Sequence, residues 1–498
     1  MKIRAAPFTL PLAAAFALCA QARGPDVADL KAYSLPTYTL VTHEERAARQ
    51  IVPQLALMER LLSTLLKREV HATGTPTYVY AVSSDLWLNY LRPSNGIDSE
   101  FVPGRFANYL ILGVGNDSGW MLERVSHEYT HYFLRTQAGG NYPLWFDEGM
   151  AKLVQKTQFR RGVALIGEQP IYFAPGLIPM ERLLRIDKSS PEYLLPSESG
   201  AVHSQSWAMV HMGFVDEPAF GAQILAYLKA RDDFLPIDEA VAKSFGMTAG
   251  QLGQKVKMYM SKPAFGKAKI PFDSPAPIPL GAGRELSELE GLESIATFML
   301  DSGFNAPRLA EVIEAAGTRA PDSDGVKILK MRLFARDRSD AELNELVRGI
   351  NPGVADPALA RGTGLALFER VRVERNDDPA SIAQRRAWST QAFGLLDQSL
   401  AARPDDAEAA WAFGMLAARL ERSLYLATRR LDHARERVPI NADLAMAQAL
   451  VCQLNGERGQ MIVHLTETAR FSRFAEQQDW ALARLANERA AAPKAPPN

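Results

Sequence analysis

Apolar and polar positions in the first half of the chain follow two different periods. Thr37–Thr42 alternates between apolar and polar residues, and the ranges 77–84 and 106–115 are rich in β-branched and aromatic residues. These patterns predict three β-strands. From Glu44 onward the apolar residues recur at helical spacing, and after residue 120 the pattern is again mostly helical, to about residue 262. Strands that precede a long run of helices indicate an α+β domain.

The second half of the chain is almost entirely helical and follows a segment dense in proline and glycine. Residues 263–284 have no helical period, which indicates a linker. Beyond it we predict a helical region at 285–380, helical repeats at 381–490 and a flexible tail at 491–498. The predicted fold is therefore an α+β domain at 23–262, followed by an all-α region.

Two segments near the C-terminus are similar at an offset of about 35 residues. Ala392 corresponds to Ala427, and Leu396 corresponds to Leu431. This period resembles that of tetratricopeptide helical pairs, and a generic helical bundle with a chance match is the alternative. Stacked helical pairs form a concave surface, so the resemblance implies a place where a protein substrate or partner binds.

The first residues have the order of features found in secretory signal peptides. Lys2 and Arg4 precede a short apolar stretch, and an A-x-A site ends at Ala22. We predict a signal peptide at 1–22 and a periplasmic or secreted mature protein. A buried N-terminal helix is the alternative. A lipoprotein anchored through Cys19 is disfavoured because the bulky Leu18 precedes that cysteine.

Charge and cysteine content narrow the classes of function. The formal net charge is −1, with 47% hydrophobic and 23% charged residues, which suits a soluble globular protein without affinity for nucleic acid. After removal of a signal peptide the only cysteine is Cys452, so no internal disulfide is expected. No later segment is apolar enough to predict a transmembrane helix.

A metal-binding motif lies within the predicted helix that ends near Gly139-Gly140. The segment "SHEYTHYFLRT" contains His127, Glu128 and His131, although the chain has only 8 histidines. Two histidines four residues apart on a helix can present their nitrogens to one metal ion, with the glutamate between them as a general base. A packed amphipathic helix is the alternative interpretation of the histidine pair alone.

A third ligand is expected in the segment "NYPLWFDEGMAKLV" that follows. Pro143 is suited to begin a helix. If the first helix turns at Gly139-Gly140 and the second returns beside it, Glu148 faces both histidines. Three protein ligands that leave a fourth position open are typical of catalytic zinc sites, so one Zn2+ ion per chain is predicted. A structural zinc site more often has four ligands and uses cysteine.

These residues resemble the gluzincin zinc metallopeptidases. "HEYTH" followed by "WFDEGMA" is similar to the H-E-x-x-H and W-x-x-E-G motifs of that clan, and "QSWAMVH" at 205–211 resembles the bacterial peptidase MA-like family. The resemblance covers about 40–262. It implies that His127, His131 and Glu148 bind zinc, and that Glu128 takes a proton from a metal-activated water and passes it to the leaving amine.

Two further features qualify the resemblance. The family often has a tyrosine before the "QSW" helix, where this chain has His203, which is either a donor to the developing oxyanion or a satisfied surface histidine. His211 is expected in the core. In gluzincins an extended substrate lies along an edge strand, here expected at 106–113. Because this stretch lacks the glutamate by which alanyl-type aminopeptidases bind a free amino end, an endopeptidase is favoured.

The sequence therefore predicts an exported zinc metallopeptidase that hydrolyses peptide bonds and binds a substrate or partner through its repeats. One alternative is a periplasmic quality-control type of protease, whose third ligand lies in a later E-x-x-x-D helix. The other is a catalytically silent scaffold that binds protein partners through the repeats.

Overall fold

The computed structural model describes residues 25–71, 73–83, 86–91, 99–114, 118–138, 140–170, 176–303, 306–353, 355–373 and 378–490. The predicted signal peptide at 1–22 and the predicted tail at 491–498 lie outside these ranges. Within them, a mixed β-sheet with surrounding helices is followed by a region made of helices, which confirms the predicted fold class. None of the described helices has the length and apolar character needed to cross a membrane.

The main sheet has six strands in the order β4-β5-β3-β2-β1-β9. Pairing is parallel between β2, β3 and β5 and antiparallel elsewhere. Three of the strands were predicted, namely those at the sheet centre. The strands are β1 (Lys31–Ser34), β2 (Thr39–Thr42), β3 (Thr77–Ser83), β4 (Ser99–Pro103), β5 (Asn108–Val114) and β9 (Arg284–Glu285).

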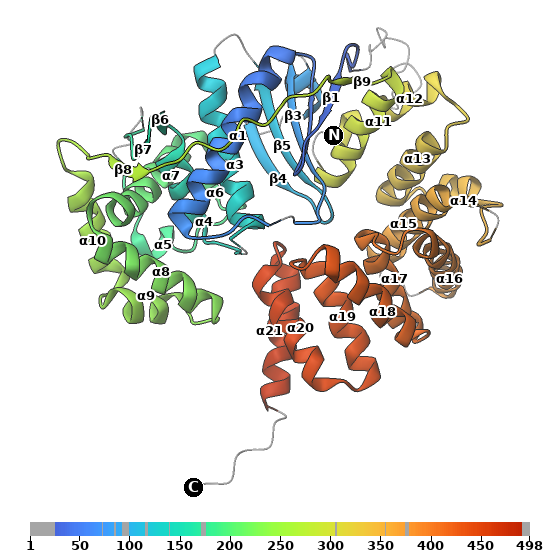
Figure 1. The fold of residues 1–498 in the computed structure, drawn as a ribbon. Helices are drawn as coiled ribbons and strands as arrows, with labels where there is room; N and C mark the ends of the chain where they lie inside the picture. Colours follow the sequence, from blue (N-terminus) through green and yellow to red (C-terminus); the bar gives the residue numbers. More distant parts are fainter. Residues whose placement is uncertain are drawn as a thin grey trace, which may run out of the picture.

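Both faces of this sheet are covered by helices (Figure 1). Side chains of a strand alternate between faces, and in β5 Leu110 packs with helices α1 (Glu45–Leu66) and α3 (Ser118–Thr136). Its neighbour Ile111 faces the other way and packs with α11 (Glu288–Ser302), the first helix of the C-terminal region. The sheet core is therefore completed by residues from both halves of the chain.

The prediction that residues 106–113 form an edge strand is wrong. Strand β5, which covers most of that range, lies between β4 and β3, and β4 occupies the edge among the described strands. The sequence of β4 is only "SEFVP", too short and too close to proline for its period to stand out.

The segment predicted as a linker contributes strands to two sheets. Strand β8 (Ala268–Pro271) pairs with the hairpin of β6 (Gln158–Arg160) and β7 (Val163–Ile166), and β9 pairs with β1 at the far edge of the main sheet. This stretch is thus a strap that is hydrogen-bonded at both ends. The hairpin itself interrupts a range that was predicted to be mostly helical.

The remaining helices of the first half lie to the left and lower left of the sheet in Figure 1. They pack into the same core as α1 and α3. They are α4 (Leu144–Val154), α5 (Met180–Leu183), α6 (Pro191–Leu194), α7 (Pro196–His211), α8 (Pro218–Asp232), α9 (Ile237–Phe245) and α10 (Ala249–Met260), with π-helical turns at Trp87–Leu91 and Met212–Asp216.

From α11 the helices pack against one another in sequence and form an arc (Figure 1). The aligned positions Ala392, Leu396, Ala427 and Leu431 are all fully buried, on equivalent faces of α16 and α18. The helices are α12 (Ala306–Arg319), α13 (Asp324–Asp337), α14 (Asp340–Val347), α15 (Pro357–Val373), α16 (Pro379–Ala402), α17 (Ala407–Leu420), α18 (Leu424–Arg437), α19 (Ala442–Asn455), α20 (Arg458–Phe471) and α21 (Ala475–Ala490). Cys452 of α19 is buried and unpaired.

The far end of the arc returns to the first half of the chain. Gly74, before β3, has a φ of 68°, and a Cβ atom there would lie 1.7 Å from the backbone oxygen of Arg437. Only glycine permits both this conformation and this approach. The C-terminal helices therefore dock directly on the backbone of the sheet domain.

Candidate metal centre

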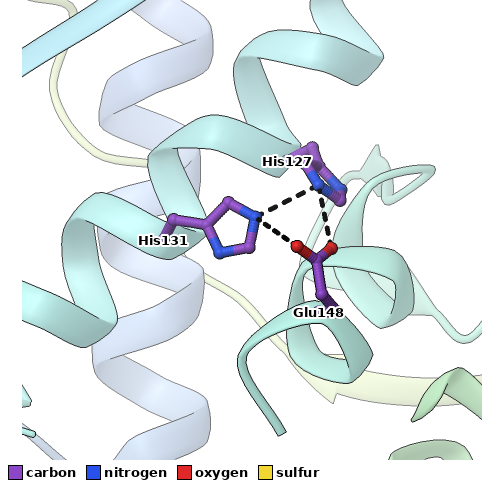
Figure 2. A group of neighbouring side chains, drawn as sticks. All are labelled: His127, His131 and Glu148. Atoms are coloured by element: carbon purple, nitrogen blue, oxygen red, sulfur yellow. Dashed lines mark hydrogen bonds and ion pairs between the residues drawn. The ribbon is translucent and has the colours of Figure 1, made fainter. Parts of the chain in front are cut away.

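Helix α3 carries both histidines of the motif on one face (Figure 2). The Nε2 atoms of His127 and His131 lie 3.2 Å apart, and both point toward helix α4. The spacing of four residues brings them one above the other, because a helical turn takes 3.6 residues. The predicted pairing of these two side chains is therefore present in the fold.

Helix α4 brings Glu148 to the two histidines. Its Oε2 lies 3.4 Å from Nε2 of His127, and its Oε1 lies 3.7 Å from Nε2 of His131. Helix α4 begins after Pro143. Gly149, the residue that follows Glu148, allows α4 to pack tightly on α7. A Cβ atom at Gly149 would lie 2.6 Å from the backbone oxygen of Ser206. The glycine after the glutamate thus sets the depth at which the carboxylate lies.

The three side chains can hold a metal ion. Their ligand atoms lie within 4.8 Å of one another, and His131 and Glu148 are almost completely buried. The Oε2 atom of Glu148 accepts no hydrogen bond of good geometry, although imidazole nitrogens surround it. A buried carboxylate oxygen without a donor is costly, so this position suits a cation.

Asp147 fixes the orientation of one ligand. Its Oδ1 lies 2.8 Å from Nδ1 of His131, which leaves Nε2 of that ring to face the other ligands. Burial lowers the pKa of His131, but the charges of Asp147 and Glu148 outweigh burial and raise this pKa to about 9. Burial and the charge of Lys152 lower the pKa of His127. A carboxylate behind a ligating histidine is the usual outer support of metal sites.

Two polar side chains lie on the far side of the Glu148 carboxylate. Tyr193 of α6 donates its hydroxyl to Oε1 at 2.8 Å, and Nε2 of His203 lies 3.2 Å from Oε2. Burial alone raises the pKa of Glu148, but the charges of His131 and His203 outweigh it and hold the pKa well below its usual range. The other ring nitrogen of His203, Nδ1, lies 2.6 Å from the backbone oxygen of Ser199, so this side chain contacts both the candidate centre and its own helix.

His211 lies in the core, as predicted. It is fully buried, its Nδ1 lies 2.6 Å from the hydroxyl of Tyr259, and its Nε2 lies near the backbone oxygens of Gly167 and Gly266. All of its polar atoms are therefore satisfied away from the metal centre.

Glu128 is buried next to the edge strand. Its Oε1 accepts a hydrogen bond from the Ser99 hydroxyl at 2.9 Å, and its Oε2 accepts one from the Phe101 backbone N–H at 2.7 Å. A carboxylate has about four lone-pair positions, so two remain free. Strand β4 thus holds the candidate base in one orientation without using its full capacity to accept a proton.

The same strand adds a second carboxylate. Burial raises the pKa of Glu100 to about 7, and its Oε2 has no hydrogen-bond partner. The charge of Glu128 adds to this rise in the pKa of Glu100 and also raises the pKa of His131. A buried acid without a donor is available to a ligand.

Sequence reasoning missed Asp147, Tyr193, Ser99 and Glu100. Asp147 stands directly before Glu148, and its position in the first turn of α4 was the one available signal. Tyr193 lies in "PEYLL", a four-residue helix with no periodic pattern, and the other two belong to the strand that was not predicted.

The chemistry that this centre can support follows from its own residues. His127, His131 and Glu148 come together from two helices, with Glu128 beside them. No protein-family model matches this chain, and no curated protein matches it.

Proposed function

We propose that this protein is a zinc-dependent hydrolase of peptide bonds, related to the gluzincin metallopeptidases. One observation carries the proposal. The side chains of His127, His131 and Glu148, which are able to bind a metal, converge at one point. Glu128, which follows His127 on the same helix, is buried outside this group and is held by the edge strand β4. A structural metal site has no need of such a separate base.

The separations of the ligand atoms support zinc as the metal. A tetrahedral zinc ion bound at about 2.0–2.1 Å requires ligand atoms about 3.3 Å apart. The two Nε2 atoms lie 3.2 Å apart, and the Glu148 carboxylate lies 3.4 Å from His127 through Oε2 and 3.7 Å from His131 through Oε1, so each of its oxygens faces one histidine. Two imidazoles and one carboxylate also match the donor set of hydrolytic zinc sites, which keep a fourth position open.

The chain's own residues supply the proton transfers. A zinc ion bound here acts as a Lewis acid and lowers the pKa of a coordinated water toward about 7. Glu128 accepts a proton from the attacking water through its free lone pairs and returns it to the leaving amine. The Tyr193 hydroxyl and the His203 imidazole contact the Glu148 carboxylate, and they would reach a developing oxyanion only by giving up these contacts.

Strand β4 supports a peptide as the substrate. Phe101 donates its backbone N–H to Glu128, so the hydrogen-bonding edge of the strand lies next to the candidate base. An extended peptide binds at such an edge through main-chain hydrogen bonds. The preference for an endopeptidase depended on an edge strand without a glutamate, and β4 contains Glu100. Peptides of one sequence with free and acetylated amino ends therefore separate the two modes of cleavage.

Metal removal tests the proposed activity. We expect the purified chain to cleave unfolded casein, and a chelator such as phenanthroline to lower the rate by about a hundredfold or more, because Lewis-acid stabilisation is worth several kcal/mol. One equivalent of zinc restores the rate. Activity that survives complete removal of zinc, checked by metal analysis, contradicts the proposal. A zinc-loaded protein that cleaves no peptide favours the silent scaffold.

The pKa of His131 predicts how zinc affinity depends on pH. The metal binds the neutral imidazole, and the proton must leave a group whose pKa is about 9 without metal. Zinc affinity should therefore rise about tenfold per pH unit from about pH 7 to 8.5. Calorimetry at pH 7.5 in two buffers of different ionisation enthalpy should show release of about one proton per zinc. Release of none would contradict the charged state of metal-free His131.

Export and partner binding remain predictions of the sequence. The signal peptide at 1–22 lies outside the described residues, and the periplasmic or secreted location depends on it. We propose the helical arc as the surface that holds a protein substrate or partner, because stacked helical pairs present such a surface.

A further inference from the structure

A cavity of about 240 Å³ lies where the helical arc returns to the sheet domain. On one side are the C-terminal end of α3 and the Gly104-Arg105 turn after β4. On the other are the segments that precede α19 and α21. Arg135, on α3, is four residues beyond His131, or about 6 Å along the helix axis. The cavity is therefore close to the metal centre but separate from its ligands.

Hydrogen bonds between the two parts of the chain fix the walls of this cavity. Arg135 donates through Nη2 to the backbone oxygen of Phe471 at 2.8 Å, and Asn141 donates to that of Ser472 at 2.8 Å. Asn441, the N-cap of α19, donates to the backbone oxygen of Arg105 at 2.9 Å. These contacts hold the cavity open in a defined shape.

Positive charge exceeds negative charge around the cavity. Three guanidinium groups line it, on Arg105, Arg135 and Arg473, whereas Asp443 is the one carboxylate among its lining residues in the described chain. Arg105 forms an ion pair with Asp443. Arg135 donates to a backbone oxygen and to the Asn141 side chain, neither of which is charged.

Of the three guanidinium groups, that of Arg473 has the least compensation of its positive charge. Its Nε is buried without a hydrogen-bond partner, and its guanidinium lies 4.5 Å from the centre of the Phe474 ring. Burial and the charges of Arg105 and Arg135 lower its pKa to about 10. Burial of an unpaired charge is expensive, and repulsion from two neighbours adds to the cost. The free donor of this side chain is thus the group that most needs an acceptor.

We infer that this cavity binds a small oxyanion, a phosphate or carboxylate group, through Arg473 and Arg135. A guanidinium presents paired N–H donors that match the oxygens of either group. The N-terminus of α19 lines the same cavity, and the positive end of that helix favours an anion further. Ordinary small-molecule sites begin near about 300 Å³, so the cavity suits a single anionic group rather than a larger ligand.

Anion titration of the full zinc-loaded chain tests this site. Inorganic phosphate and glutarate, a small dicarboxylate, are the two probes, and sodium chloride at equal ionic strength is the reference. We expect one or both probes to raise the melting temperature in a saturable manner that chloride does not reproduce. The stronger probe identifies the source of the anionic group. Equal responses to both probes and chloride overturn the inference.

One variant of Arg473 and one control variant locate the effect. Arg473→Gln is expected to weaken binding of the effective probe by about tenfold or more, because a charged hydrogen bond is lost. Arg348→Gln, at an arginine whose side chain is 75% exposed, is the matched control and should bind as the wild type does. Binding of an anion to the zinc ion itself would be equal in all three proteins. An unchanged affinity in Arg473→Gln overturns the site.

The stability of the unliganded protein gives an independent readout. Arg473→Met removes a buried unpaired charge and keeps an apolar side chain against Phe474, so its melting temperature without anion should exceed that of the wild type. The same variant should no longer respond to the probe. A lower melting temperature would show that Arg473 is needed to hold the empty structure together, and the inference would fail.

Discussion

Replacing Glu148 with glutamine is expected to lower the affinity for zinc by more than about a hundredfold, since even residues behind the ligands contribute ten- to a hundredfold. Glutamine has nearly the same volume and keeps an oxygen for the Tyr193 hydroxyl, so the packing of α4 should persist. What it removes is the negative charge between His127, His131 and His203. Two histidines and a neutral amide are a weaker donor set for zinc than two histidines and a carboxylate.

Competition with a fluorescent zinc chelator measures this affinity directly. Glu198→Gln is a suitable control, because the Glu198 side chain lies on the exposed surface of α7. Circular dichroism on both variants reports whether the fold is intact. Zinc bound by Glu148→Gln as tightly as by the wild type would exclude Glu148 as a ligand and remove the basis of the proposed centre.

Replacing Glu128 with glutamine should abolish hydrolysis without removing zinc. Loss of a general base typically costs about 10²–10⁴ in rate. The amide can keep both hydrogen bonds of the carboxylate, because its oxygen accepts from the Phe101 N–H and its NH₂ group donates to a Ser99 hydroxyl that has rotated. The change therefore removes the charge and the basicity while the strand β4 contact remains.

The two readouts for this variant are kcat/KM on a peptide that wild type cleaves and the zinc content after dialysis. Glu123→Gln, on the same helix, serves as the control, because the Glu123 carboxylate accepts a hydrogen bond from Gln155, which lies outside the centre. A Glu128→Gln protein that binds zinc and cleaves at the wild-type rate would refute the assignment of the base. Loss of zinc together with activity would mean that Glu128 supports the metal site instead.

The three residues of the candidate metal centre were predictable because helical geometry and a short turn bring them together. His127 and His131 are placed together by helical geometry alone, and Glu148 needs only a turn between two consecutive helices. The general α+β character followed from periodic patterns that extend over many residues. Local rules were sufficient wherever the partners were close in sequence.

The surroundings of the ligands depend on contacts that no local pattern specifies. Strand β4 is identified by its pairing with β5, and Glu100 becomes part of the centre through that pairing alone. The contact from Arg135 to Phe471 joins residues 336 positions apart. Such pairs are chosen by the packing of the whole molecule, so the edge strand was misplaced and the junction of the two parts was not foreseen.

The position of α11 on the sheet has a consequence for the folding of the protein during its synthesis. Tyr80, Val82 and Ile111 form a face of the sheet that is covered by Leu292, Ile295 and Phe298, which leave the ribosome much later. Until then that apolar face has no cover, and an uncovered sheet face is not stable in water. The half of the chain that carries the candidate metal centre therefore cannot mature as soon as it is synthesised. Its assembly waits for the helices behind it, so a nascent chain carries the motif long before it carries a working centre.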